Sequence, residues 1–259
     1  MVAIRHVRHA TLELQFTDTR VLVDPMLGDP GDIDPIPNTP NQRENPLVPL
    51  PALAVNAIDA VLVTHLHRDH FDDAARERLD ADVPILCQPA DADSLAADFD
   101  DVRPVEDTLE FAELTVTRTP ARHGHGALAD EMGPVSGFVL DDGEGRSPSG
   151  NRSKAGDDES VYVAGDTVWY DADAETLATA APDVAIVNAG AAQFLEGDPI
   201  TMTKEEVVTF TEATDADVIA VHMDAINHCL LSRVELEQHL EEVGLDDRVV
   251  VPRDGDSVR

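Results

Sequence analysis

The stretch THLHRDH at residues 64–70 decides the fold, because it brings four metal-binding side chains together within six residues. It directly follows an apolar run that is typical of a buried strand. Neutral imidazoles and carboxylates are the ligands of Zn²⁺ and similar divalent ions. Alternate residues leaving a strand point to one side, so we expect His65 and His67 to share one ion and Asp69 and His70 to face a second. A chance surface cluster is the alternative, and the position behind a buried strand argues against it.

One loop cannot complete two metal sites, so further ligands must come from elsewhere in the chain. Polar residues that follow other predicted strands are the candidates, namely His123, Asp166 and His222. Two histidines compete with this choice. His125 lies two residues after His123, and His228 lies six residues after His222. We favour His222 because it directly ends an apolar strand.

The charge balance excludes several classes of partner. The 259 residues include 18 basic and 52 acidic side chains, which gives 18 − 52 = −34. This charge repels phosphates, so we expect neither nucleic acid nor an anionic membrane surface as a partner. Plentiful Asp and only two Lys are typical of a cytoplasmic protein from an extreme halophile, where salt screens self-repulsion. One acidic partner-binding face is the alternative, but the charge is spread along the whole chain.

The two cysteines and the first residues of the chain indicate the cellular compartment in which we expect the protein. Cys87 and Cys229 lie far apart and form no CxxC motif, which indicates a reducing cytoplasm. The chain opens on a predicted strand that contains charges, so we expect no secretory leader. No apolar stretch is long enough for a transmembrane helix.

Patterning along the chain predicts one α/β domain over residues 1–259. Residues 25–51 hold eight of the seventeen prolines, so we predict a long loop there, and residues 141–160 form a predicted polar insertion. The predicted strands are 2–7, 11–16, 20–23, 60–64, 84–88, 102–105, 114–119, 135–140, 161–164, 184–188, 218–222 and 248–251. The predicted helices are 72–79, 91–97, 172–180, 204–213 and 233–243.

Together these motifs resemble the metallo-β-lactamase superfamily. THLHRDH matches its HxHxDH signature, and the later His, Asp and His match its remaining motifs in order. RHAT (8–11), LVDP (22–25), MGPVSGF (132–138) and VHMD (221–224) resemble the branch that includes L-ascorbate-6-phosphate lactonase. The resemblance implies an αββα sandwich, in which two mixed sheets pack face to face with helices outside. It is specific for fold and metal site, and much less so for substrate.

The resemblance also implies a ligand set and a pair of metal ions. Site one takes His65, His67 and His123; site two takes Asp69, His70 and His222; Asp166 bridges the pair. Zinc is the first choice of metal, with manganese or iron as alternatives, since all ligands offer nitrogen or oxygen.

The implied activity is that of a metal-dependent, lactonase-like hydrolase acting on a small-molecule lactone, ester or amide. Two ions lower the pKa of a shared water so that hydroxide attacks the carbonyl carbon, and Asp69 is the implied catalytic orienter or proton shuttle. A phosphodiesterase or nuclease on the same site is one alternative, and a non-hydrolytic metal-binding protein is another. A homo-oligomeric protein is compatible with each of these activities.

Several residues near the motifs are candidates for binding substrate or for orienting a ligand by a hydrogen bond. These are His9, Asp24, Arg122, His125 and His228. Arg68, Arg122 and Arg233 are also candidates to hold an anionic substrate group, and for Arg122 and Arg233 pairing to nearby carboxylates is the alternative.

Overall fold

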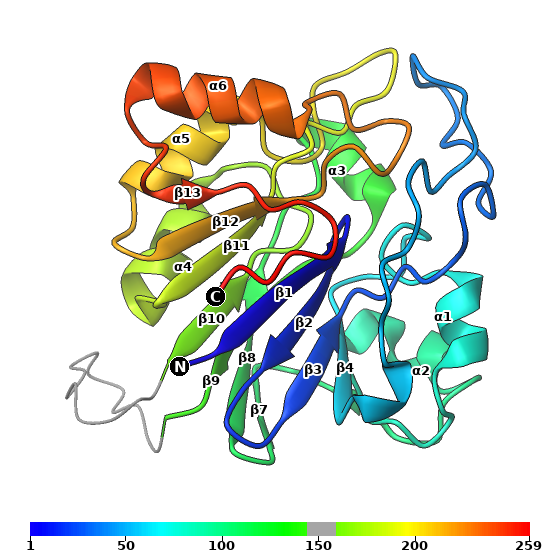
Figure 1. Cartoon of the computed structure of the whole chain (residues 1–259). Helices are drawn as coiled ribbons and strands as arrows, with labels where there is room; N and C mark the ends of the chain where they lie inside the picture. The colour runs from blue at the N-terminus through cyan, green and yellow to red at the C-terminus, as the bar shows by residue number, and fades with distance from the viewer. Residues whose placement is uncertain (144–158) are drawn as a thin grey trace.

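Two mixed β-sheets pack face to face, and helices cover their outer faces (Figure 1). The computed structural model describes residues 1–143 and 159–259. The first sheet has the strand order β1-β2-β3-β4-β5-β6. Neighbours are antiparallel from β1 to β3 and parallel from β3 to β6. The strands are β1 Ala3–Arg8, β2 Thr11–Gln15, β3 Arg20–Val23, β4 Ala60–Val63, β5 Ile85–Cys87 and β6 Val102–Pro104.

The second sheet has the strand order β13-β12-β11-β10-β9-β8-β7. Its neighbours are antiparallel from β7 to β10 and parallel from β10 to β13. The strands are β7 Thr108–Phe111, β8 Leu114–Pro120, β9 Ser136–Asp141, β10 Ser160–Val163, β11 Val184–Asn188, β12 Asp217–Val221 and β13 Val249–Val250.

Helices on both outer faces complete the αββα sandwich that the sequence predicts. The helices are α1 Asp73–Arg78, α2 Ala92–Leu95, α3 Gly126–Met132, α4 Asp171–Ala180, α5 Lys204–Glu212 and α6 Arg233–Val243, with short 3-10 turns η1 Val55–Ala57 and η2 Pro89–Asp91. α1 and α2 pack on the first sheet, and α4, α5 and α6 pack on the second. The central strands are continuous apolar runs because both of their faces are buried, as in AVLV of β4.

Strand direction brings the carboxyl ends of many strands to one edge of the sandwich. In the first sheet β1, β3 and β4 run the same way, and in the second sheet β8, β10, β11 and β12 do. A hydrogen bond joins these two sets, since the His222 N–H after β12 donates to the His9 carbonyl after β1 at 3.0 Å. The loops that follow these strands therefore meet at one place.

Residues 25–51 form no helix or strand, as predicted, and only an isolated bridge joins Ile33 to Asn45. The loop packs against the segment that follows His222, where Met26 and Ile33 share one apolar cluster with Ile226. Its backbone is held by the buried Arg8, whose guanidinium donates to carbonyls of Met26, Gly28 and Val48. The loop is thus held in place beside the edge where the strand ends meet.

The predicted insertion at 141–160 needs correction at its ends. Asp141 belongs to β9 and Ser160 to β10, and the two residues are paired in the sheet. They are strand residues because their backbones complete the antiparallel ladder. Residues 144–158, the centre of the predicted insertion, lie outside the described residues.

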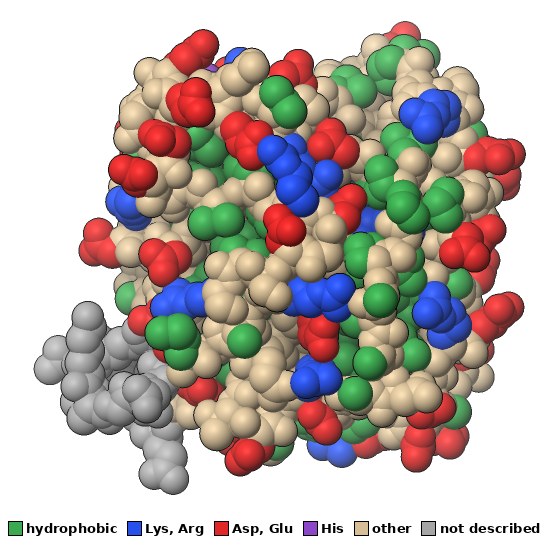
Figure 2. All heavy atoms as spheres, in the orientation of Figure 1, with side chains coloured by type: hydrophobic (Ala, Val, Ile, Leu, Met, Phe, Trp, Pro, Cys, Tyr) green, Lys and Arg blue, Asp and Glu red, His purple; other side chains and the backbone are tan. Residues whose placement is uncertain are grey.

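Acidic side chains are prominent on the surface of the protein. Figure 2 shows Asp and Glu side chains scattered over the visible face, with fewer Lys and Arg between them. Across residues 1–143 and 159–259, no helix has both the length and the apolar content that crossing a bilayer requires.

Candidate metal centre

The loop after β4 supplies four of the candidate ligands. β4 is buried along its length and ends at Val63, so the chain leaves the sheet just before His65. A tight turn follows, in which the His70 N–H donates to the His67 carbonyl at 2.9 Å. The next helix, α1, begins at once, and the Asp72 side chain caps it by accepting the Ala75 N–H. A buried strand and a capped helix therefore fix both ends of this loop.

The first cluster consists of His65, His67, His123 and Asp166, which offer ligand atoms within 4.8 Å of one another. His65 Nε2 lies 3.0 Å from His67 Nδ1. Asp166 Oδ2 lies 3.3 Å from His123 Nε2 and 3.8 Å from His65 Nε2. Three imidazoles and one carboxylate oxygen thus converge on one point.

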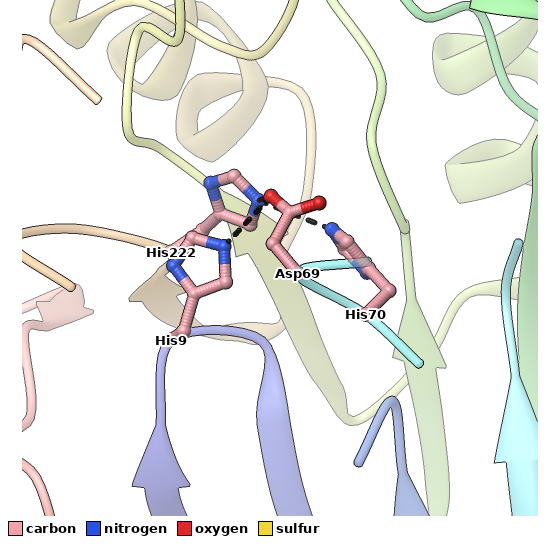
Figure 3. A group of neighbouring side chains, drawn as sticks. All are labelled: His9, Asp69, His70 and His222. Carbon is pink, nitrogen blue, oxygen red and sulfur yellow. Dashed lines mark hydrogen bonds and ion pairs between the residues drawn. The ribbon is translucent and has the colours of Figure 1, made fainter. Parts of the chain in front are cut away.

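The second cluster consists of His9, Asp69, His70 and His222, again within 4.8 Å of one another (Figure 3). His70 Nε2 lies 3.1 Å from His222 Nε2. The Asp69 carboxylate faces His9 and His222, with its Oδ2 3.2 Å and 3.7 Å from their Nε2 atoms. All four side chains are buried.

Asp166 connects the two clusters. Its Oδ2 faces the first cluster, while its Oδ1 lies 3.3 Å from both His70 Nε2 and His222 Nε2 in the second. The residue follows β10, and the preceding Gly165 has a φ of +68° and lies against the Ser136 carbonyl. A side chain at position 165 would clash there, so glycine lets the backbone place Asp166 between the clusters.

The outward ring nitrogens of the cluster histidines show that the donor set fits divalent metal ions. A histidine that binds a metal through one nitrogen holds its other N–H on an acceptor. Each of the five histidines that the sequence predicts as ligands has such a partner: His65 Nδ1 with Thr64 Oγ1 at 3.0 Å, His67 Nε2 with Met132 O at 3.1 Å, His70 Nδ1 with Asp24 Oδ2 at 2.8 Å, His123 Nδ1 with Ile200 O at 2.8 Å and His222 Nδ1 with Cys229 Sγ at 3.6 Å. One nitrogen of each ring is therefore left to face its cluster.

Burial and neighbouring charges set the protonation of the clusters. Burial lowers the pKa values of His65 and His222 well below the usual value, so these rings are neutral. Burial also lowers the pKa of His70, but the carboxylates of Asp166 and Asp24 outweigh it and the pKa is raised well above the usual value. Burial raises the pKa of Asp166, yet the histidines around it, His222 foremost, hold it well below the usual value. Asp166 is thus an ionised carboxylate, and a cation bound at His70 would displace its proton.

The residues around the second cluster have unusual backbone conformations. His9, Asp24 and His222 have φ angles of 58°, 43° and 71°, in the left-handed region that non-glycine residues rarely adopt. Asp24 follows β3, and its oxygens accept the Thr64 N–H at 2.8 Å and the Thr64 hydroxyl at 2.7 Å. Strain of this kind concentrates at functional sites.

Two of the alternative ligands lie outside both clusters. His125 is exposed and precedes α3 as its N-cap, whereas His123 lies in the first cluster. His228 is 5 % exposed, and its Nδ1 has no hydrogen-bonding partner among the described residues. It stands near Phe194, with ring centres 6.5 Å apart, whereas His222 lies in the second cluster.

The three arginines near the motifs differ in their surroundings. Arg68 pairs with Asp73 at 2.8 Å on the surface, and Arg233 pairs with Asp224 at 3.2 Å. The Arg122 guanidinium lies over the Tyr170 ring, 4.5 Å from its centre. Arg68 and Arg233 are thus paired with carboxylates, whereas the buried Arg122 Nε has no hydrogen-bonding partner among the described residues.

Two residues that contact the metal centre were not among the site residues predicted from the sequence. Asn188 ends β11 and donates through Nδ2 to Asp166 Oδ1 at 2.7 Å. Its position, a polar residue ending a buried strand, is the same signal that identified Asp166 and His222. Gly190 lies against the His222 carbonyl, where a Cβ would stand only 2.2 Å away.

Comparison with known proteins supports the same fold. The Beta-lactamase superfamily domain model matches residues 19–223. The UPF0173 protein YddR of Bacillus subtilis is 37% identical over 262 residues, 98% of each chain. A UPF0173 metal-dependent hydrolase of Methanopyrus kandleri is 27% identical over 96% of each chain. The crystal structure of an isothiocyanate hydrolase from Delia radicum gut bacteria superposes with a TM-score of 0.88 at 32% identity, covering 99% of this chain and 98% of that one. The chain therefore belongs to the beta-lactamase superfamily and, within it, to the UPF0173 family of metal-dependent hydrolases.

Proposed function

We propose that this protein adds water to the electrophilic carbon of a small, uncharged molecule, with two divalent metal ions as cofactors. The carbon is that of a lactone, ester or amide carbonyl, or of an isothiocyanate, which the name of the structural relative suggests. The observation that carries the proposal is the shared carboxylate, because Asp166 offers one oxygen to each cluster. Two bound ions would supply Lewis acidity and lower the pKa of water.

The protein's own groups divide the remaining tasks. Asp166 holds the two clusters in a fixed relation, and its bond from Asn188 fixes the carboxylate plane. Asp69 is the carboxylate at the second cluster that is not shared, and it is 6 % exposed. We assign to it the orientation of the attacking water and the acceptance of its proton.

The preference for an uncharged substrate follows from the electrostatics. Within the described residues, the ion-pair partners of Asp69 and Asp166 are all histidines. The arginines nearest the motifs are paired with carboxylates or stacked on a ring. A phosphodiester would bring a further negative charge into a chain of net charge −34. The geometry therefore favours a neutral substrate over a phosphodiester or a nucleic acid.

Burial points to a small substrate. Of the eight side chains in the two clusters, seven are buried and only His67 is partly exposed. The Met132 carbonyl of α3 lies 3.1 Å from His67 Nε2 and holds this side chain in place. We take the near-complete burial of the clusters as a reason to expect compact substrates rather than polymers.

A substrate panel on zinc- and manganese-loaded protein in molar KCl tests the proposal. The panel contains a γ-lactone, p-nitrophenyl acetate, an alkyl isothiocyanate and bis-p-nitrophenyl phosphate. We expect turnover of at least one neutral substrate that exceeds turnover of the phosphodiester and that disappears in Asp166→Asn. Turnover of the phosphodiester alone would contradict the proposal, as would equal rates in the variant.

A further inference from the structure

We propose that His9 is a positioning residue that orients the Asp69 carboxylate by a hydrogen bond and does not itself bind metal. The proposal rests on the two-ion site proposed above. His9 shares the second cluster with three predicted ligands, so its place alone would equally allow it to be a fourth ligand. Three features of the structure separate these roles.

The His9 ring is held in place by protein contacts. His9 forms the turn between β1 and β2 with a φ of 58°. Its carbonyl accepts the His222 N–H at 3.0 Å and lies 3.0 Å from His6 Nε2. Its ring lies against the His222 ring, with centres 3.7 Å apart, and is fully buried. The orientation of the ring is therefore fixed without coordination.

The ring reaches the carboxylate of Asp69. His9 Nε2 lies 3.2 Å from Asp69 Oδ2, within hydrogen-bonding distance. A proton on Nε2 would fix the position of this oxygen, which also lies 3.7 Å from His222 Nε2 in the second cluster. Carboxylates that bind metals are commonly held by such a partner.

The surroundings of the other ring nitrogen, His9 Nδ1, distinguish a positioning residue from a metal ligand. The five predicted ligand histidines each have a partner on the outward nitrogen, but His9 Nδ1 is buried and has none among the described residues. If Nε2 bound metal, the ring proton would sit on Nδ1 as a buried donor without an acceptor, an arrangement that is unfavourable and rare in folded proteins. With the proton on Nε2, Nδ1 is a bare lone pair, which proteins tolerate more readily than an orphan N–H.

Two substitutions test the hydrogen bond through cobalt binding. Asn tolerates the left-handed backbone but is too short to reach Asp69, whereas Gln carries an N–H donor farther out. We expect His9→Asn to weaken binding of the second Co²⁺ about 10–100-fold, as when a partner that holds a ligand is lost. His9→Gln should recover most of that affinity, and His125→Gln, an exposed control, should match the unaltered protein.

The visible spectrum of the cobalt-saturated protein separates positioning from coordination. We expect His9→Asn at saturation to keep the position and intensity of the d–d bands, because no ligand is lost. A changed band would identify His9 as a ligand and overturn the proposal. Undiminished affinity in His9→Asn would overturn it as well, as would His9→Gln binding as weakly as His9→Asn.

A measurement on the unaltered protein covers the case in which a variant does not fold. Ring nitrogen shifts of His9 in the zinc-loaded protein should show a protonated Nε2 and an unprotonated, metal-free Nδ1. A metal-bound Nε2 would refute the proposal. None of these measurements needs a substrate, so their outcome does not depend on which reaction the protein catalyses. If the unaltered protein is saturated by one ion, the two-ion site itself is refuted.

Discussion

Replacing Asp166 by Asn removes the charge that the two clusters share and nearly preserves the shape of the side chain. Asp166 Oδ1 lies 3.3 Å from two histidine nitrogens and Oδ2 lies 3.3 Å from a third, so any ion in either cluster would be within about 4 Å of this charge. Two unit charges 4 Å apart interact by about 4 kcal/mol at an effective dielectric constant of about 20, which corresponds to roughly 10³-fold in affinity. We therefore expect Asp166→Asn to lose at least one ion after dialysis and to hydrolyse substrate orders of magnitude more slowly.

Asp224→Asn is the matched control for this variant. Asp224 lies two residues after His222, is partly exposed and pairs with Arg233 at 3.2 Å. Its φ is 64°, a conformation that Asn also adopts, so the substitution removes one charge without backbone strain. We expect this variant to retain both ions, as measured by elemental analysis and calorimetric titration. Two ions bound with unchanged affinity in Asp166→Asn, or equal losses in the two variants, would refute the role of Asp166 as the shared ligand.

Three further predictions concern stability and packing. Burial raises the pKa of Asp173 to about 7, so the folded protein holds this proton more tightly than the unfolded chain and the free energy of unfolding falls as pH rises from about 4 to about 7. Asp173→Asn should remove that slope and stabilise the protein at pH 8 by up to about 4 kcal/mol in denaturant titrations; parallel pH profiles for the two proteins would contradict this. Raising KCl from about 0.1 to about 3 M should raise the melting temperature, because salt screens repulsion within a chain of charge −34, whereas a flat response would argue against adaptation to salt. Gly190→Ala should destabilise the protein by about 1–3 kcal/mol and weaken metal binding at the second cluster, since the new methyl group meets the His222 carbonyl, and unchanged melting and metal content would show that the backbone yields there.

The sheets and the ligand loops were predictable because local patterns determine them. A fully buried strand such as β4 or β11 is a short apolar run, and the polar residue that ends it stands out. Asp166 and His222 each follow such a strand, whereas His123 follows the half-buried strand β8. The strands β8, β10 and β12 run the same way and bring the three residues to one edge. Pattern and topology therefore indicate the same site.

One helix and one strand escaped prediction for identifiable reasons. Helix α3, Gly126–Met132, has no buried residue, so it shows no apolar periodicity, and glycine at its start weakens the helix signal. Strand β7, Thr108–Phe111, is an edge strand with only one buried residue, Phe111. Such elements are stabilised by what they pack against, which one sequence does not show.

The supporting contacts of the site were also beyond reach of the sequence. His67 and His123 are oriented by the carbonyls of Met132 and Ile200, and a carbonyl is present in every residue. The arginines near the motifs pair with acidic side chains such as Asp73 and Asp224, and an acidic chain offers many partners for each cation. Only the folded arrangement shows which pairs form.

The most direct test of the two-ion site is an anomalous difference map from crystals grown with zinc or manganese. We expect two peaks per chain, one on each side of the Asp166 carboxylate and about 3.5–4 Å apart, with His65, His67 and His123 around one peak and Asp69, His70 and His222 around the other. His9 should lie beyond bonding distance of both peaks. A single peak, or peaks that Asp166 does not touch, would contradict the two-ion site on which the proposed hydrolysis depends.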